Sequence, residues 1–294
     1  MPARLTAYLP NAAAWCLLRA RTSIRIGRGP ECDFQVDHPS VSRNHAELTW
    51  QAPDWQLRDL GSKNGSFVDG LPIVSAILGD AAWFRLGDVV CEFAATSEEE
   101  AANFERRQSL RRANSVLMLE GIGKQTALPD LLLDTLRSVV ELSDCERGFL
   151  LLTGNGSLKV AASVGMDAST LGEKSFRGSI GVAQRVLLEK IPVVVNEARF
   201  DAELAGRRSI MAGGLRTLVC IPLLADGQVI GLAYADSRKP GALITTMDLD
   251  LLRAFAERAA VWIAARRGMD TLAMMATGQA DWSEILHAQH LASA

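Results

Sequence analysis

The sequence predicts a multidomain protein, with an all-β sandwich followed by an α+β domain that has a central antiparallel sheet and flanking helices. Its 294 residues exceed the size at which a single hydrophobic core usually divides. Up to about residue 95, short apolar runs alternate with turn residues, which is typical of a sandwich. From about residue 126, amphipathic helical patterns and apolar strands follow one another instead.

The first domain is expected over residues 1–95, with its strands between Leu17 and Glu92. The pair Pro53-Asp54 is typical of a turn between two strands. The last strand is expected from Val89 to Phe93, after a Gly-Asp turn. The predicted core contains Trp50, Trp55, Leu57 and Leu60.

Three short clusters stand out in this domain: Gly27-Arg28, Ser40–His45 and Ser62–Gly65. In a sandwich, residues far apart in the chain meet on loops at one end of the sheets. An arginine supplies a fixed fork of donors, a serine supplies a rotatable hydroxyl, and backbone N–H groups supply further donors. Together these groups would form an oxyanion receptor suited to a phosphate on another protein.

The segments that carry these clusters are IGRGPECDFQVDHPSVSRNHAEL and LRDLGSKNGSFVDGLPI. They resemble the forkhead-associated (FHA) domain, whose pattern runs Gly-Arg, then Ser-Arg-x-His, then Asn-Gly. The similarity covers about residues 5–95. It implies a β-sandwich that recognises phosphothreonine.

The resemblance assigns roles to individual side chains. Arg28 and Ser42 are expected to bind the phosphate directly. Arg43 is expected to flank it, where it adds charge or contacts the peptide. Asn64 is expected to hold the peptide backbone, and Lys63 to add a charge-assisted contact.

Other residues of the clusters are expected to shape the loops. The resemblance assigns Gly27 to the loop architecture, His45 to bracing the binding loop, and Gly65 to a turn with positive φ. Taken singly, Arg28 reads as a surface arginine, Ser42 as a turn former, and Asn64-Gly65 as a hairpin turn. Their joint occurrence at this spacing favours the receptor.

Residues 96–125 are expected to form a linker helix. Thr96 or Ser97 is a suitable N-cap, and the three glutamates that follow suit the positive end of a helix dipole. The helix is either a solvated connector or a signalling helix that pairs with its copy in a dimer.

The second domain is expected over residues 126–267, followed by a tail over residues 268–294. Its pattern is helix, two strands, helix, strand, polar segment, two strands and helix. These elements are predicted at 128–144, 147–153, 157–165, 179–190, 191–195, 196–214, 216–224, 228–237 and from 245 or 246 to 267.

The stretches ERGFLLL, KIPVVVNEARFDAEL, LRTLVCIPLLADGQVIGLAYADS and DLDLLRAFAERAAVWIA resemble a GAF domain, a small-molecule sensor or dimerisation module. The resemblance places a pocket over the sheet, beneath the polar segment. Candidate pocket residues are Asn196, Arg199, Phe200 and Arg216, which read alternatively as loop residues and one core aromatic. The signature of cyclic-nucleotide-binding members is not reproduced, because Glu197 stands where they carry a lysine.

Several classes of function are excluded by what the sequence lacks. A net charge of −3 without a basic, aromatic-rich helix argues against nucleic acid, and no apolar run is long enough for a membrane span. The five scattered cysteines predict reduced thiols in a cytoplasmic protein. His287 and His290, without a further ligand, do not predict a metal site. No catalytic or cofactor-binding motif is found, so no enzyme and no cofactor are expected.

These features together predict a cytoplasmic signalling adaptor of bacterial type. Its expected partners are a phosphothreonine-containing protein and the Ser/Thr protein kinase that modifies it. A homodimer through the first and last helices of the GAF domain is expected by analogy. Two alternatives stay open: a GAF sensor gated by a cyclic nucleotide or other small molecule, and the truncated sensory part of a larger transcriptional regulator or cyclase.

Overall fold

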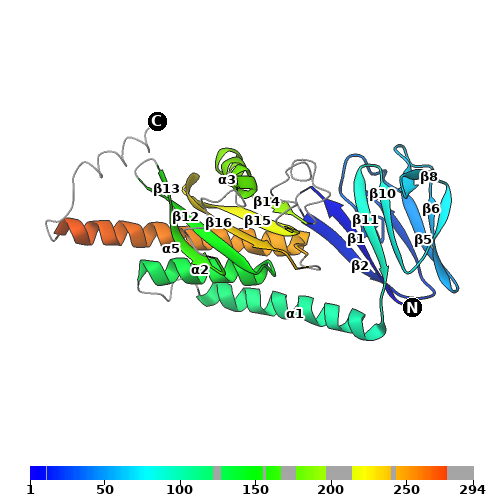
Figure 1. Cartoon of the computed structure of the whole chain (residues 1–294), viewed down its shortest axis with the longest axis horizontal. Coiled ribbons are helices and arrows are strands. Elements are labelled where there is room, and N and C mark those ends of the chain that lie inside the picture. The colour runs from blue at the N-terminus through cyan, green and yellow to red at the C-terminus, as the bar shows by residue number, and fades with distance from the viewer. Residues whose placement is uncertain are drawn as a thin grey trace. The chain divides into compact units, whose positions relative to one another are not determined.

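The computed structural model describes residues 1–10, 12–121, 127–154, 157–166, 177–196, 214–239 and 243–276 (Figure 1). The chain divides into two compact units. The first is built chiefly from residues 1–113, and the second from residues 114 onward. The division between a β-sandwich and a mixed helix-and-sheet unit agrees with the predicted fold class.

The first unit is a sandwich of a six-stranded and a five-stranded sheet. The six-stranded sheet has the order β2-β1-β11-β10-β7-β8, from β1 (Ala3–Leu9), β2 (Ala12–Leu18), β7 (Ser66–Val68), β8 (Leu71–Ile73), β10 (Ala81–Leu86) and β11 (Val89–Ala95). The five-stranded sheet has the order β4-β3-β5-β6-β9, from β3 (Ser23–Gly27), β4 (Phe34–Gln35), β5 (Ala46–Gln51), β6 (Asp54–Asp59) and β9 (Ser75–Leu78).

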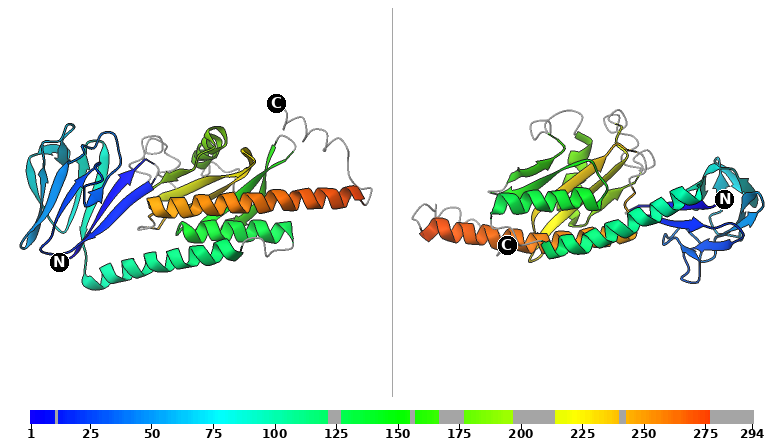
Figure 2. Two further views of the ribbon diagram at one scale, coloured as in Figure 1. Left: turned by 180° about the vertical axis from the view of Figure 1, so that it is seen from behind. Right: turned by 90° about the horizontal axis from the view of Figure 1, so that it is seen from below.

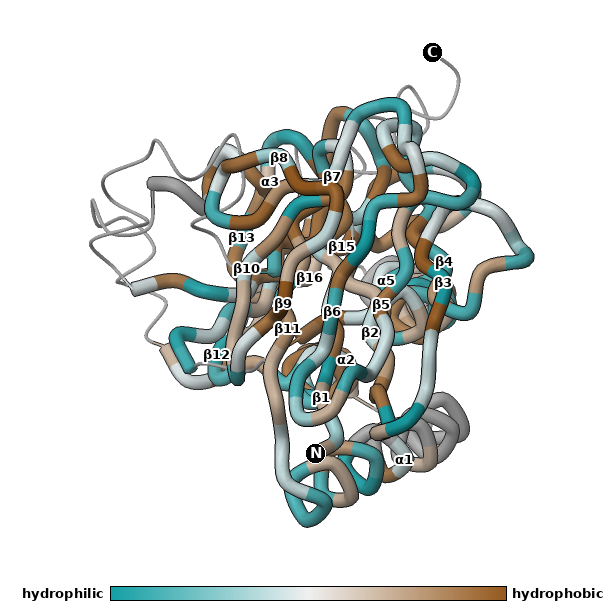
Figure 3. The backbone as a smooth tube through the Cα atoms, turned by 90° about the vertical axis from the view of Figure 1, so that its right-hand side faces the viewer, coloured by the Kyte–Doolittle hydropathy of each residue, from teal (hydrophilic) through white to brown (hydrophobic). Residues whose placement is uncertain are grey.

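The sandwich core lies between the two sheets and follows the strand period of two. On β1, Leu5 is fully buried while Arg4 and Tyr8 on the opposite face are partly exposed. Figure 3 shows hydrophobic and hydrophilic residues along the strands of this unit. Each fully buried aliphatic side chain stabilises the fold by about 1.5–3 kcal/mol. The largest buried side chains here include Leu18, Ile26, Leu48, Leu57, Leu78, Leu86 and Phe93.

The expected start of the sandwich was wrong, because strands precede Leu17. β1 is a central strand that pairs with both β2 and β11. Its core positions include Ala3 and Ala7, whose small side chains give a weak hydropathy pattern despite complete burial. The core residues Trp55 and Leu57 are buried as expected, and Trp50 is partly buried against the same core.

Helix α1 (Glu98–Gly121) follows the last strand and begins with a capping box. The Glu100 backbone N–H donates to Ser97 Oγ over 3.1 Å, and the Ser97 N–H donates to Glu100 Oε2 over 2.9 Å. One turn further on, the Phe104 ring packs edge-on against Trp15, with centroids 4.6 Å apart. The first turns of α1 therefore dock on the outer face of the six-stranded sheet.

The second unit has a five-stranded antiparallel sheet with the order β13-β12-β16-β15-β14. Its elements are α2 (Leu128–Leu142), β12 (Arg147–Gly154), β13 (Ser157–Val164), α3 (Arg177–Glu189), β14 (Val193–Val195), β15 (Thr217–Ala225), β16 (Gln228–Ser237) and α5 (Thr246–Ala276). Helices α2 and α5 cover one face of the sheet and α3 covers the other (Figures 1 and 2).

Helix α5 is longer than predicted, because it continues past Arg267 to Ala276. The expected stop was wrong since Gly268 is followed by further helix-forming residues. A glycine inside a helix costs only about 1 kcal/mol relative to alanine. The helix is continuous there, and Thr271 Oγ1 donates to the Arg267 carbonyl over 2.8 Å.

One buried ion pair joins two strands of this sheet. Asp236 is 1% exposed, and its carboxylate accepts from Arg147 Nε over 2.6 Å and Nη2 over 3.2 Å. The Tyr234 hydroxyl also donates to Asp236 Oδ2 over 2.9 Å. The Tyr234 ring in turn stacks on Phe149. Both oxygens of the carboxylate are hydrogen-bonded, and such bonds are needed to offset the cost of burying an ion pair.

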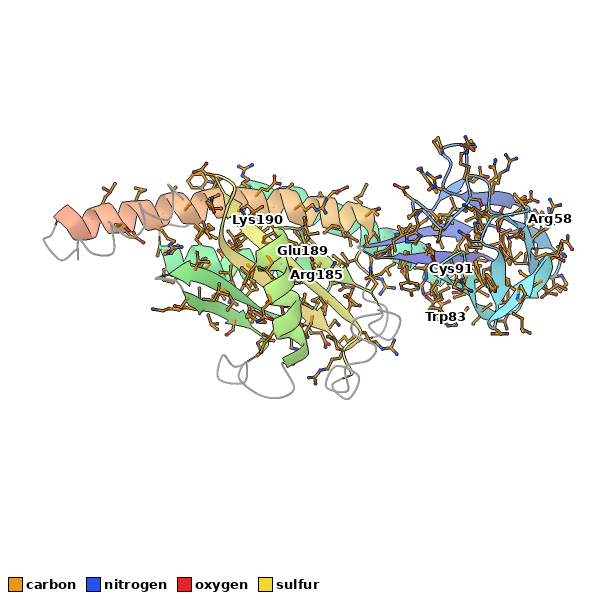
Figure 4. All side chains as sticks on the ribbon, turned by 90° about the horizontal axis from the view of Figure 1, so that it is seen from above. Arg58, Trp83, Cys91, Arg185, Glu189 and Lys190 are labelled. Carbon is orange, nitrogen blue, oxygen red and sulfur yellow. The ribbon has the colours of Figure 1, made fainter. Side chains whose placement is uncertain are left out.

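Removing the carboxylate should therefore destabilise the second unit strongly. We expect Asp236→Ala to lower the free energy of unfolding by about 3 kcal/mol, because it leaves the part-buried Arg147 unpaired. The matched control is Arg185→Ala on α3, which breaks the exposed pair of Arg185 with Glu189 (Figure 4) and should cost less than about 1 kcal/mol. Urea denaturation measures both, and equal losses would contradict the prediction.

Candidate functional site

Four connecting segments meet at one end of the sandwich. They are the β3–β4 connection, the segment before β5, the β6–β7 connection and the β10–β11 turn. The Arg28 N–H donates to the Ser42 carbonyl over 2.9 Å, which joins the first two. Asn64 Nδ2 donates to the Ser40 carbonyl over 2.8 Å, which joins the β6–β7 connection to the segment before β5. The Asp88 N–H donates to Ser40 Oγ over 2.8 Å, which joins the β10–β11 turn to that same segment.

The contact between the first two segments requires glycine at position 27. A Cβ on Gly27 would overlap the carbonyl oxygen of Arg43. Without that Cβ, the two backbones lie close enough for the Gly29 N–H to donate to the Arg43 carbonyl over 3.0 Å. Gly27 thus places Arg28 beside Ser42 through main-chain contacts alone.

Arg28 has most of its guanidinium fork available. The residue is exposed, and Nε makes one long bond of 3.4 Å to the Val41 carbonyl. Among the described residues, no hydrogen bond engages its Nη nitrogens. Arg43 and Lys63 are also exposed on these loops, so cationic groups gather at this end of the sandwich.

Ser42 lies half-buried between the two loops. Its Oγ accepts from the Lys63 backbone N–H over 3.0 Å. Because that bond uses a lone pair of Oγ, the hydroxyl proton is still available as a donor. Ser42 and Lys63 are thereby held side by side, with Asn64 as the next residue along the chain.

His45 is completely buried and links the segment before β5 to the β6–β7 connection. Its Nδ1 accepts from the Ser42 N–H over 3.0 Å, which requires the ring proton to be on Nε2. Nε2 then donates to the Gly65 carbonyl over 3.2 Å. Burial lowers the pKa of His45, and the Gly65 carbonyl and the nearby Asp59 carboxylate oppose this only in part.

Asp59 organises the β6–β7 loop. Its Oδ1 accepts from the N–H groups of Gly61 and Ser62, and its Oδ2 from the hydroxyls of Ser62 and Ser66. Partial burial by itself raises the pKa of Asp59, but these hydrogen bonds outweigh it and the net pKa is lowered. Gly65 closes the loop with φ of +75°, a conformation that glycine adopts without strain.

Sequence reasoning missed Asp59, Ser66 and Gly87 as supports of the site. Gly87 has φ of +58°, and a Cβ there would overlap the Ser40 carbonyl. The available signal at Asp59 was its position two residues before Gly61, because an aspartate commonly accepts from the N–H groups of a following turn.

The structure brings together the residues predicted for phosphopeptide binding. Arg28, Ser42, Arg43, Lys63 and Asn64 all lie on the connected loops, with Gly27, His45 and Gly65 between them.

The predicted GAF pocket is described only in part. Asn196 follows β14, and the Arg216 N–H donates to the Ser237 carbonyl over 3.0 Å just before β15. Arg199 and Phe200 lie outside the described residues, as do His287 and His290. The described part of the chain contains no group of three or more histidine, cysteine or acidic residues that could hold a metal ion. Among its helices, none combines the length and hydropathy needed to cross a bilayer.

Comparison with family models gives two matches. The model described as FHA domain matches residues 24–87, and the model described as GAF domain matches residues 127–263. The chain carries an FHA domain followed by a GAF domain. The matched FHA range contains the first three connecting segments in full and ends at Gly87, the first residue of the β10–β11 turn.

Curated relatives match over about a quarter of the chain. The glycogen accumulation regulator GarA of Mycolicibacterium smegmatis is 37% identical over 78 residues, which are 26% of this chain and 49% of that protein. The oxoglutarate dehydrogenase inhibitor of Corynebacterium diphtheriae is 38% identical over 78 residues, 26% of this chain and 54% of that protein. The chain thus spans about half the length of these relatives.

Solved FHA structures are also similar to this chain. One comes from a study of phosphothreonine-dependent FHA domain interactions, with 29% identity and a TM-score of 0.31 over 33% of this chain and 99% of that chain. Another is the FHA domain of the CT664 protein from Chlamydia trachomatis, with 25% identity and a TM-score of 0.31 over 33% of this chain and 100% of that chain.

The lowered pKa of His45 predicts a loss of FHA stability on acidification. An unfolded histidine titrates near pH 6.5, above the folded value, so the unfolded state binds the proton first as the pH falls. The contribution of His45 is therefore complete above about pH 6.5 and is lost as the pH falls toward the folded pKa. The slope is at most about 1.4 kcal/mol per pH unit for one proton.

Amide exchange at the Ser42 N–H, measured against pH, tests this. We expect His45→Gln to weaken the protection of the Ser42 amide against exchange at neutral pH. The variant should also show a smaller change of that protection between pH 7 and 5. His38→Gln is the matched control, since His38 bonds Ser40 on the same loop but is not completely buried. An unchanged pH slope in His45→Gln would refute the prediction.

Proposed function

We propose that the FHA domain binds a phosphothreonine of another protein and that the chain acts as a signalling adaptor without catalysis. The observation that carries this proposal is the joining of Arg28, Ser42 and Lys63 on loops that backbone bonds, His45 and Asn64 hold together. A Ser/Thr protein kinase would supply the phosphate, so that binding follows phosphorylation.

Each binding residue has a role that follows from its available groups. The Nη fork of Arg28 donates to two phosphate oxygens, and the Ser42 hydroxyl donates to a third. Arg43 and Lys63 add positive charge at the rim, which suits a group carrying about −1.5 to −2 charges at neutral pH. Asn64 has its Nδ2 on the Ser40 carbonyl and presents Oδ1 to a peptide N–H.

The names of the relatives support a regulatory role. GarA is named as a regulator of glycogen accumulation, and the corynebacterial protein as an inhibitor of oxoglutarate dehydrogenase. Both names describe regulatory proteins. We extend only this regulatory character to the present chain, because the shared region is about half of each relative.

Arg28→Ala tests the receptor. Loss of a forked, charged pair of hydrogen bonds should weaken binding of phosphothreonine peptides to the full chain at least 100-fold, about 2.7 kcal/mol. The control is Arg58→Ala on β6 (Figure 4), an exposed arginine whose Nη2 bonds Glu47 at 2.6 Å and which should bind as the wild type does. Binding is measured by fluorescence anisotropy, with unphosphorylated and phosphoserine peptides alongside. Retained affinity in Arg28→Ala would refute the proposed function.

For the GAF domain we propose dimerisation, with α5 in the interface. This helix exposes a row of apolar side chains at helical spacing, which is typical of a helix that pairs with another. The row contains Val261 (61% exposed), Trp262 (43%), Met269 (60%) and Leu272 (65%). Small-molecule sensing is the alternative role, with Asn196 and Arg216 as pocket candidates.

We propose that the chain divides into the FHA domain over residues 1–95, a linker helix over 96–125, the GAF domain over 126–267 and a tail over 268–294. Helix α5 crosses the boundary between the GAF domain and the tail.

Val261→Asp should shift the chain from dimer to monomer, because burying an unpaired carboxylate in an apolar interface is unfavourable. Sedimentation velocity at several protein concentrations measures the shift. Leu188→Asp on α3 is the control, since Leu188 is 83% exposed and lies outside the proposed interface. A wild-type chain that is monomeric throughout, or a variant that dimerises equally well, would exclude α5 as the interface.

A further inference from the structure

Residues 71–78 form an unusual segment of the FHA domain, which we name the edge segment. Its sequence, LPIVSAIL, contains no charged residue. Three of its aliphatic side chains are largely exposed: Leu71 (70%), Val74 (80%) and Ile77 (68%). In the view of Figure 3, the tube is brown, meaning hydrophobic, along β8. Single exposed aliphatic residues are ordinary, but several of them on one short uncharged segment are typical of an interaction surface.

The edge segment supplies an outer strand to both sheets of the sandwich. β8 ends the six-stranded sheet beside β7, and β9 ends the five-stranded sheet beside β6. An edge strand leaves backbone N–H and C=O groups unpaired on its outer side, and soluble proteins usually protect such edges with charged side chains or proline. Here Pro72 protects part of β8, while the segment from Val74 to Leu78 has neither proline nor charge.

The edge segment is continuous with the phosphate-binding loops. The Asp59 N–H donates to the Val74 carbonyl over 2.9 Å, and the Asp59 carboxylate accepts from the Ser62 N–H over 2.8 Å. One residue, Asp59, therefore connects Val74 to the loop that carries Lys63 and Asn64. On the neighbouring strand, Ile73 pairs with Ser66.

We propose that the edge segment binds an aliphatic stretch of the same phosphorylated partner, beside its phosphothreonine. This rests on the proposed function. Because Val74 is bonded to Asp59, which also holds the loop that carries Lys63 and Asn64, an extended peptide bound at that loop can continue along the edge segment. The absence of charge on the segment selects aliphatic rather than acidic or basic side chains. The open edges add backbone hydrogen bonds by strand addition.

The test uses the full chain and a phosphothreonine peptide library with six randomised positions on each side. We expect the wild type to enrich aliphatic residues at flanking positions. Val74→Asp should remove that enrichment while still preferring phosphorylated peptides. For the best aliphatic peptide, the affinity of Val74→Asp should fall about tenfold, the effect of losing roughly one buried aliphatic contact. Leu188→Asp, which places the same charge on α3, should leave enrichment and affinity unchanged.

The outcomes separate this inference from the function on which it rests. If Val74→Asp binds an alanine-flanked phosphothreonine peptide as tightly as the wild type does, the variant is folded. Its loss of enrichment for aliphatic residues then supports the proposed role of the edge segment. Phosphothreonine selectivity without any aliphatic enrichment, or with enrichment unchanged in Val74→Asp, overturns the inference alone. If Val74→Asp instead lowers self-association in sedimentation velocity without changing peptide selection, the edge segment joins copies of this chain and the inference is overturned. No selectivity for phosphorylated peptides in the wild type overturns the proposed function.

Discussion

The FHA site depends on one buried imidazole. His45 Nδ1 accepts a hydrogen bond from the Ser42 N–H, and Nε2 donates one to the Gly65 carbonyl on the other loop. The neutral Nε2–H form of the ring is therefore the form that satisfies both loops. A protonated ring would present a second donor to the Ser42 N–H and would lose that bond. Because both partners are main-chain groups, the ring fixes backbone positions. Ser42, Lys63 and Asn64 take their places from this arrangement.

The sequence predicted the phosphopeptide-binding residues of the FHA site better than it predicted the residues that hold the loops in place. Arg28, Ser42 and Asn64 belong to short clusters whose spacing is visible in the sequence, and the fold brings those clusters to one end. Asp59 and Gly87 act through contacts that exist only after folding: a carboxylate turned into its own loop, and a missing Cβ beside Ser40. The first contact leaves only the spacing between Asp59 and Gly61 as a signal, and the second leaves no pattern along the chain.

Similar limits apply to the boundaries of secondary structure. β1 escaped prediction because alanines occupy core positions between two neighbouring strands, where small side chains bury fully without a strong hydropathy signal. The end of α5 was misplaced because a glycine at position 268 looks like a stop, although the surrounding helix tolerates it. The hairpins and amphipathic helices of the GAF domain were predicted well, since period and turn chemistry are local properties.

Main-chain groups hold the loops of the FHA site together, and this affects how recognition of the partner can change. The carbonyls of Ser40, Ser42, Arg43 and Gly65 hold the loops together, whereas the side chains of Arg43 and Lys63 face solvent. Substitutions at those two rim positions alter charge and reach without removing any of these main-chain contacts. A new partner preference can therefore arise by mutation at the rim while the phosphate receptor keeps its geometry, which makes Arg43 and Lys63 natural positions for engineering altered selectivity.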